Sequence, residues 1–296
     1  MGRGERMELH HKAVSGGRLS RILREEMGMS LSLMNKLKWD DRLLINGAPC
    51  HTDHLVWPGD MVVALLPDPS PEYPAEDGDL TVLYEDAWFL AVEKPAGMLI
   101  HPSRSCNTGT LANYVLGYYK ETNQSCAFHP ITRLDRDTFG VVLLAKNAHI
   151  HALMMAQLRD GTVKKTYFAL VYGQPSESGI IDAPIARREK PSLLRYVDES
   201  GKPCRTEYIR MESRDEYSML KLHPITGRTH QLRVHCAYMG FPILGDPQYG
   251  NEESLALSRK MGIETQALCA GRLEFLHPIT GQTLRIETNM TLYNRQ

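Results

Sequence analysis

A turn rich in charge stands directly before an apolar run near the middle of the chain. Residues 133–138 read Arg-Leu-Asp-Arg-Asp-Thr, and residues 141–145 read Val-Val-Leu-Leu-Ala. The apolar run predicts a buried strand. Burying an unpaired charge next to it is costly, so the two arginines and two aspartates must form ion pairs or take part in function. Taken alone, the six residues fit a solvated turn as well as a functional one.

The order of the predicted elements favours an α+β fold. Helices are expected at 111–120 and after Asn147, a helix cap whose helix ends at Gly161. Strands are expected at 80–86, 89–94, 141–145 and 167–172, with a hairpin formed by 273–276 and 283–286. Because strands and helices do not alternate regularly, the sheet is predicted to be largely antiparallel.

A change of composition divides the chain into two parts. Residues 67–78 contain four prolines and four carboxylates, which favour an extended, solvated linker. The sequence therefore predicts a small unit at 1–67, a linker at 68–78 and a body at 79–296. The small unit is expected to hold two short helices and a small sheet, with Gly28 ending the first helix and Ser30 or Ser32 capping the second.

Composition narrows the class of protein. The net charge of −1 gives no global attraction to nucleic acid, so any phosphate contact must come from local patches. One such patch, residues 187–190 with Arg195 after it, fits a solvated loop equally well. The six cysteines are scattered, which favours free thiols in a reducing cytoplasm. No apolar run is long enough to span a membrane, and the first residues lack the apolar core of a secretory signal.

A second unusual stretch favours a functional role for the charged turn over a solvated one. Residues 226–235 read Thr-Gly-Arg-Thr-His-Gln-Leu-Arg-Val-His. With the charged turn, this stretch resembles the signature segments of the RluA-type pseudouridine synthases, which isomerise uridine in RNA. The resemblance extends in order over most of the body, through residues 82–86, 93–98, 165–167 and 242–250. It implies a pseudouridine synthase fold, with a mixed, mostly antiparallel central sheet and flanking helices, and an rRNA or tRNA substrate.

The resemblance also implies roles for three residues. Asp135 would be the nucleophile, Tyr167 would stand in the active site, and Arg233 would face the nucleophile. A carboxylate can serve this chemistry without metal or cofactor, and we expect neither. It must be ionised, which requires a nearby cation, and a guanidinium can pair with it bidentately. Asp137 is expected to accept backbone hydrogen bonds within the turn.

Further residues are predicted to contact RNA. Arg133 suits the space left by a uridine that is flipped out of folded RNA. Tyr167 shares a strand face with Lys165; periodicity alone favours a core tyrosine, whereas the resemblance favours stacking on a base. The other predicted contacts in the body are Arg136, Lys165, Arg228, His230 and Gln231.

The small N-terminal unit resembles the alpha-L RNA-binding module through its turns at 45–47 and 58–60. This loose likeness implies RNA contact by Lys36, Lys38 and Arg42. The alternative is that these are ordinary solvated side chains and that the unit only packs on the body.

The chain departs from the family pattern at two positions, and two other functions compete with this interpretation. The family usually has histidine where this chain has Thr132, and serine where it has Phe139. A metal hydrolase would need ligand spacing that His230 and His235, five residues apart without an intervening glutamate, do not provide. A non-catalytic RNA-binding or ribosome-assembly protein is the second rival, but Asp135, Tyr167 and Arg233 are all present. We expect a cytoplasmic monomer.

Overall fold

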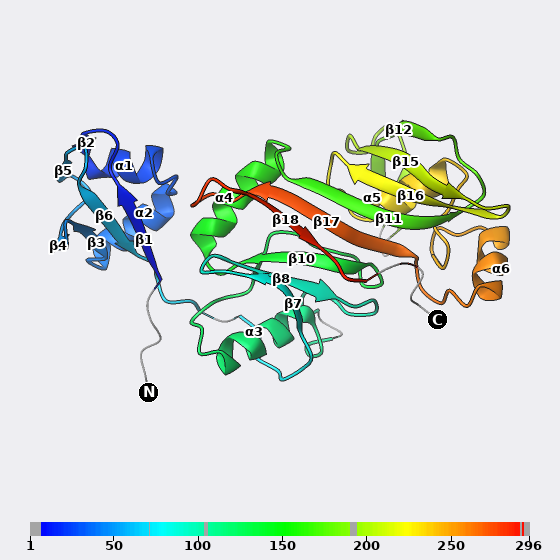
Figure 1. Ribbon diagram of the computed structural model, residues 1–296, viewed down its shortest axis with the longest axis horizontal. Helices are drawn as coiled ribbons and strands as arrows, with labels where there is room; N and C mark the ends of the chain where they lie inside the picture. Colours follow the sequence, from blue (N-terminus) through cyan, green and yellow to red (C-terminus); the bar gives the residue numbers. More distant parts are fainter. Residues whose placement is uncertain (1–6, 71, 104–105, 190–193, 291, 293–296) are drawn as a thin grey trace.

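The computed structural model describes residues 7–70, 72–103, 106–189, 194–290 and 292. The molecule is elongated, with a small N-terminal unit at one end and a long body built on one twisted sheet (Figure 1). The prediction of an α+β fold with a mostly antiparallel sheet is confirmed.

The N-terminal unit contains two helices and a small sheet, as predicted. Ser30 caps the second helix, because its hydroxyl accepts the Leu33 amide, and Gly28 lies at φ 63° just beyond the first helix. The sheet has the order β1-β6-β3-β4, and β2 pairs with β5. The elements are β1 (Glu8–Lys12), β2 (Gly17–Arg18), α1 (Leu19–Glu25), α2 (Leu31–Trp39), β3 (Leu43–Ile45), β4 (Ala48–Pro49), β5 (Leu55–Val56) and β6 (Met61–Leu65).

The body is organised around a ten-stranded sheet with the order β12-β15-β16-β11-β17-β10-β8-β7. Strand β18 pairs with β17, and β9 pairs with β10. The strands are β7 (Thr81–Glu85), β8 (Phe89–Lys94), β9 (His129–Pro130), β10 (Phe139–Ala145), β11 (Lys164–Tyr172), β12 (Ser178–Asp182), β15 (Arg205–Ser213), β16 (Tyr217–Pro224), β17 (Leu268–Leu276) and β18 (Thr283–Glu287). Among the described pairings of this sheet, that of β10 with β17 is parallel and the others are antiparallel.

Helices cover both faces of the first half of the sheet. Alternate residues of β8 point to opposite sides, so Leu90 packs with α3 (Leu111–Glu121) and Phe89 packs with α4 (Ala148–Arg159). Strand β10 alternates in the same way and is buried along its whole length, as its apolar sequence predicts. Asn147 caps α4 by accepting the Ile150 amide.

The second half of the sheet repeats this plan. Val171 of β11 packs with α5 (Gln231–Tyr238), and the neighbouring Leu170 packs with α6 (Glu252–Lys260) on the opposite face. Strand β17 lies between the two halves, with β10 on one side and β11 on the other (Figure 1).

The junction of the two halves requires a glycine. Gly140 has φ 113°, and a Cβ built on it would lie 2.3 Å from the carbonyl oxygen of Ala270. Because a side chain does not fit there, Gly140 permits β10 to approach β17 closely. Tyr167 of β11 pairs with the same Ala270 from the other side. The turn before β10 and the start of β11 are thereby brought together.

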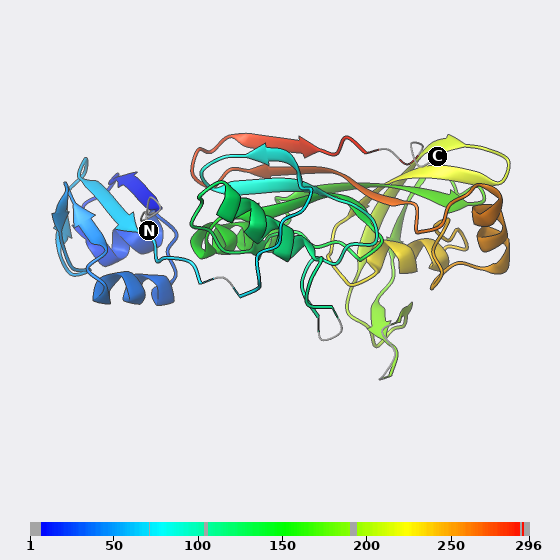
Figure 2. The same ribbon diagram turned by 90° about the horizontal axis from the view of Figure 1, so that it is seen from below.

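A hairpin projects from the body. It consists of β13 (Ile185–Arg187) and β14 (Arg195–Val197), and we call it the arm. Figure 2 shows the arm pointing away from the sheet, with the loop that carries the bridge between Ser103 and Cys106 extending in the same direction. The basic residues Arg187 and Arg195 belong to the arm, and Lys190 lies outside the described residues.

The N-terminal unit packs against the body at α4. The Asn147 amide nitrogen lies 2.7 Å from the Met7 sulfur, and Met27 supplies a backbone hydrogen bond to His149. A cavity of about 340 Å³ remains between the two parts.

The second half of the predicted linker is not free in solvent. Asn113 of α3 donates to the Pro74 carbonyl at 2.9 Å and accepts, through its own carbonyl, the Glu76 amide at 3.0 Å. The segment from residue 74 onward therefore lies against α3, because the side-chain amide and the backbone carbonyl of Asn113 bind it.

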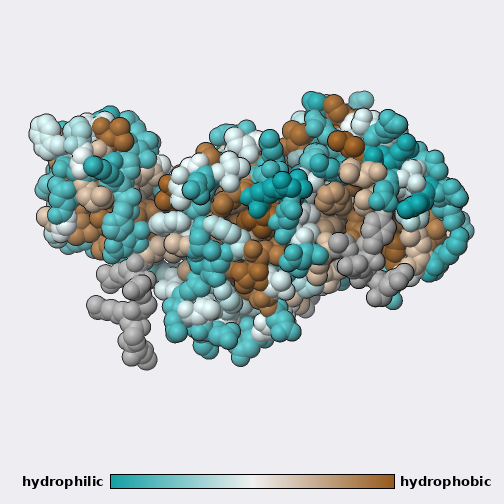
Figure 3. Space-filling view, in the orientation of Figure 1, coloured by the Kyte–Doolittle hydropathy of each residue, from teal (hydrophilic) through white to brown (hydrophobic). Residues whose placement is uncertain are grey.

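The surface in Figure 3 is mostly hydrophilic at its edges, with hydrophobic patches over the middle of the body. Within the described ranges, no helix is both long and apolar enough to cross a membrane.

Candidate active site

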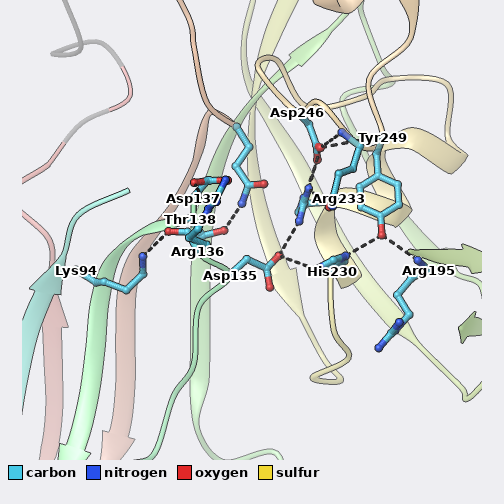
Figure 4. Close-up of polar contacts among 12 residues, drawn as sticks. Lys94, Asp135, Arg136, Asp137, Thr138, Arg195, His230, Arg233, Asp246 and Tyr249 are labelled. Carbon is cyan, nitrogen blue, oxygen red and sulfur yellow. Dashed lines mark hydrogen bonds and ion pairs between the residues drawn. The ribbon is translucent and has the colours of Figure 1, made fainter. Parts of the chain in front are cut away.

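A buried lysine holds the charged turn in place. Lys94 ends β8 and is fully buried. Its ammonium group donates to the carbonyls of Pro95, Met98 and Arg136, at 2.8, 2.8 and 2.7 Å (Figure 4). On the other side of the turn, the Gln266 amide donates to the Thr138 hydroxyl at 2.5 Å. These bonds anchor the turn at Arg136 and Thr138, just after Asp135.

Asp135 points from this turn towards α5. Its Oδ2 atom accepts a hydrogen bond from Arg233 Nη1 at 3.2 Å (Figure 4). The Asp135 side chain is 27% exposed, whereas that of Arg233 is 6% exposed. The predicted pairing of a guanidinium with Asp135 is therefore present in the geometry, and it joins the two stretches that the sequence singled out.

The bidentate partner of Arg233 is a different carboxylate. Asp246, which is fully buried, accepts from Nε at 2.7 Å and from Nη2 at 2.8 Å. Gln248 accepts a further bond from Nη2 at 2.8 Å. The expected bidentate pairing of the guanidinium with Asp135 is wrong, because Asp246 binds Nε and Nη2 and leaves Nη1 to donate to Asp135.

Asp246 and Gln248 had no predicted role. Both lie in the segment 242–250, where Asp246 Oδ1 also accepts the amides of Gln248 and Tyr249 at 2.9 and 3.2 Å. The signal was an acidic residue after a run of apolar residues and a glycine, Pro242 to Gly245. A carboxylate in such surroundings needs a cation, and the buried Arg233 provides it.

The electrostatics of the site follow from these contacts. Burial lowers the pKa of Arg233, but hydrogen bonds and charge from Asp246, and then from Asp135, raise it overall, so Arg233 stays charged. Burial and the nearby charge of Asp135 raise the pKa of Tyr167. Tyr167 therefore keeps its phenolic proton at neutral pH and stands close enough to Asp135 to sense its charge.

The other predicted RNA contacts in the body divide into exposed and buried residues. Arg133, Arg136 and Arg228 are exposed, and Lys165 is partly buried near Gly227, with a pKa lowered by burial. Gln231 is buried, and its amide bonds Thr226, Arg205, Thr206 and the Arg228 backbone. RNA contact by Gln231 is therefore not supported, because its amide is engaged within the protein.

Asp137 in the turn, and Thr132 and Phe139 on either side of it, have contacts within the protein. Asp137 binds the Arg136 guanidinium through both oxygens at 3.1 Å, in place of the expected backbone amides. The buried Thr132 hydroxyl accepts the Leu143 amide at 3.0 Å, so Thr132 shapes the turn. Phe139 is buried in the sheet.

The two histidines of the segment 226–235 do not share a site. His230 lies beside Asp135, with Nε2 4.0 Å from Oδ2. His235 is buried, and its ring nitrogens contact the Thr206 hydroxyl and the Ala183 carbonyl. In the described part of the chain, no group of three or more His, Cys, Asp or Glu residues is arranged to hold a metal ion.

The predicted basic residues of the N-terminal unit lie in different surroundings. Lys36 lines the cavity between unit and body, and the Lys38 ammonium lies 5.5 Å from the ring centroid of the exposed Trp39. Arg42 donates to the Leu66 carbonyl at 2.9 Å and pairs with Asp68 at 3.4 Å. RNA contact by Arg42 is thus disfavoured by its existing partners.

A family model described as RNA pseudouridylate synthase matches residues 88–238, a span that includes Asp135, Tyr167 and Arg233. The chain belongs to this family. The uncharacterized RNA pseudouridine synthase YlyB of Bacillus subtilis is 36% identical over 253 residues, which cover 84% of this chain and 82% of that protein. The ribosomal large subunit pseudouridine synthase D of Nitrosomonas europaea is 34% identical over 248 residues, covering 82% and 72%.

The fold agrees with this assignment. The solved structure titled Human RNA Pseudouridylate Synthase Domain Containing 1 aligns with a TM-score of 0.59 at 25% identity, covering 73% of this chain and 86% of that one. This chain is therefore an enzyme that isomerises uridine to pseudouridine in RNA. The family, fold class and reaction predicted from the sequence are confirmed.

Proposed function

We propose that Asp135 is the nucleophile of this pseudouridine synthase and that the substrate is a uridine in structured rRNA. The observation that carries the proposal is the unequal environment of its two oxygens. Oδ2 is held by Arg233, whereas Oδ1 has no hydrogen bond to any described residue. A fixed, partly exposed carboxylate with one open oxygen is suited to attack a substrate.

The reaction needs no net change of electrons or atoms. The bond between N1 and C1′ breaks, a bond between C5 and C1′ forms, C5 loses a proton and N1 gains one. A carboxylate can attack the sugar or the base, or guide removal of a proton, during this exchange. Tyr167 keeps its proton beside Asp135, so it can stack on the base and donate a hydrogen bond there.

RNA contact is assigned to the exposed cations around the site. Arg133 and Arg136 flank Asp135, and Arg228 stands at the start of the neighbouring segment. Lys36 and Lys38 of the N-terminal unit are proposed to meet phosphates further along the RNA. The names of relatives that act on the large ribosomal subunit favour rRNA over tRNA. We place the enzyme in the cytoplasm as a monomer that needs neither metal nor cofactor.

The test replaces Asp135 with asparagine in the full chain. Asp135→Asn keeps the size of the side chain but removes its negative charge. Tritium release from C5-labelled large-subunit rRNA should fall to less than about one part in a thousand, since an essential nucleophile matters more than an assisting acid or base. RNA affinity and melting temperature should stay near those of the wild type.

Two outcomes would contradict the proposal. Turnover by Asp135→Asn above that level would remove Asp135 from the role of nucleophile. Mapping of pseudouridine in total RNA from a deletion strain decides the substrate, because a lost site in tRNA instead of rRNA would overturn the rRNA assignment. A wild-type protein that binds RNA without tritium release would favour the non-catalytic alternative.

A further inference from the structure

His230 adopts a conformation that must be held by its surroundings. It is the N-cap residue of α5 and lies at φ 57° and ψ 18°, in the left-handed region. This region is unfavourable for a residue with a side chain, so the neighbouring contacts have to maintain it. The next residue, Gln231, is fixed by four hydrogen bonds of its side-chain amide. Backbone strain that is maintained beside a reacting group is a reason to look for a function.

Tyr249 fixes the protonation pattern of the His230 ring. The Tyr249 hydroxyl lies 2.7 Å from His230 Nδ1 and accepts the backbone amide of Arg195 at 3.0 Å (Figure 4). Among the described residues, Nδ1 is the acceptor available for the hydroxyl proton. A hydroxyl that donates to Nδ1 leaves the proton of a neutral imidazole on Nε2.

The protonated nitrogen faces the nucleophile. Nε2 lies 4.0 Å from Asp135 Oδ2, the oxygen that also accepts from Arg233. The His230 side chain is 15% exposed, and its ring meets the Tyr249 ring edge-on at a centroid distance of 5.7 Å. The Tyr249 ring in turn lies 4.9 Å from the Arg233 guanidinium. The four side chains therefore form one packed group.

We propose that His230 is a positioning residue for Asp135, oriented by Tyr249 and, through Arg195, by the arm. This inference rests on the proposed role of Asp135. Arg233 donates a hydrogen bond to Oδ2, and the His230 N–H faces the same oxygen at 4.0 Å, which leaves Oδ1 directed at the nucleotide. Because Arg195 begins β14, the arm that projects from the body is connected to the nucleophile by two hydrogen bonds and one close contact.

The charges around His230 keep its ring neutral. Burial lowers its pKa, and Arg233 and Arg195 lower it further, against the opposing charges of Asp135 and Asp246. Tyr249 also faces the ring, and its own pKa is raised, first by burial. At neutral pH the imidazole therefore remains an acceptor at Nδ1, which the geometry requires.

The kinetic test uses two full-length variants. His230→Asn keeps a residue that tolerates the left-handed region and an amide near the Nδ1 position, but removes the group that faces Asp135. Tyr249→Phe keeps the ring against Arg233 and removes the hydroxyl. Tyr238→Phe, at an exposed position of α5, is the matched control.

Both active-site variants should slow single-turnover tritium release from C5-labelled large-subunit rRNA by about 10- to 100-fold. This is the loss expected when the contact of His230 with Asp135 tightens into a hydrogen bond to a charged group as the substrate binds. The dissociation constant for that RNA should change less than about twofold, and Tyr238→Phe should match the wild type. A wild-type rate in His230→Asn, or a loss confined to RNA binding, would overturn the proposal.

An NMR measurement tests the link without turnover. Long-range proton–nitrogen spectra of histidine-labelled wild-type enzyme should show the His230 proton on Nε2, and Tyr249→Phe should shift it towards a mixture of tautomers. A wild-type proton on Nδ1 would refute the assignment. If the wild type releases no tritium, the proposed function fails, and the spectra still decide whether Tyr249 orients His230.

Discussion

Arg233 connects a structural carboxylate to the proposed nucleophile, so Arg233→Lys should damage both stability and rate. The wild-type guanidinium makes three bonds to Asp246 and Gln248 and one to Asp135. A lysine ammonium acts from a single point and cannot span the two Asp246 oxygens and Asp135 together. Asp246 is fully buried, so weakening its pair should cost about 3 kcal/mol of unfolding free energy, the lower end of the range for a broken buried pair.

The two effects can be measured separately. A loss of about 3 kcal/mol corresponds to a melting temperature lower by roughly 6–12 °C for a domain of this size. Loss of the bond to Asp135 should reduce single-turnover tritium release by about 10- to 100-fold at a temperature where the variant is folded. Arg233→Met should be worse in both assays, because it leaves two carboxylates unpaired.

The comparison with Asp246→Asn locates the cause. This variant keeps the shape of the Arg233 partner and the contact of Arg233 with Asp135, so it should lose stability while retaining more activity than Arg233→Lys. If Arg233→Lys melts within 1 °C of the wild type and turns over at the wild-type rate, the reasoning from the shared guanidinium is refuted.

Two further predictions concern His149 of α4, where the body meets the N-terminal unit, and two lysines of that unit. Burial lowers the pKa of His149 to about 4, below its unfolded value of 6.5, so its contribution to stability is present above pH 6.5 and declines towards pH 4. Between pH 7 and pH 5, the free energy of urea unfolding should fall by about 2 kcal/mol more for the wild type than for His149→Gln. Equal losses of free energy would contradict this. The double variant Lys36→Ala/Lys38→Ala should bind rRNA more weakly, and the slope of log affinity against log salt concentration should be shallower by about two. Lys260→Ala, at an exposed lysine of α6, is the control. An unchanged slope in the double variant would show that neither lysine meets a phosphate.

Local structure was predictable from the sequence where it depends on residues close together in the chain, as helix caps and buried strands do. Asn147 and Ser30 cap the helices that they were expected to cap, and the apolar run of β10 is buried throughout. These features depend on neighbours within a few positions, so the sequence shows them directly.

The candidate site was predictable in part. The two charged stretches and the contact between Asp135 and Arg233 were inferred correctly, but the bidentate partner of Arg233 was not, because Asp246 reaches it through the fold of residues 242–250. The pairing of Gly140 with Ala270 is equally remote in sequence. Such contacts depend on tertiary packing, which no local pattern specifies.

The position of β17 in the sheet implies that the two halves of the body are joined late in synthesis. Strand β17 is the next-to-last strand of the described chain, and it separates β10 from β11 in the sheet. Until residues 268–276 have been synthesised, β10 and β11 both lack the strand that lies between them in the complete sheet. The Asp135 turn belongs to one half, and Tyr167 and the α5 arginine belong to the other. We therefore expect that a nascent or prematurely terminated chain cannot bring Asp135 to Tyr167 and Arg233, and that modification of uridine begins only after synthesis has passed this strand.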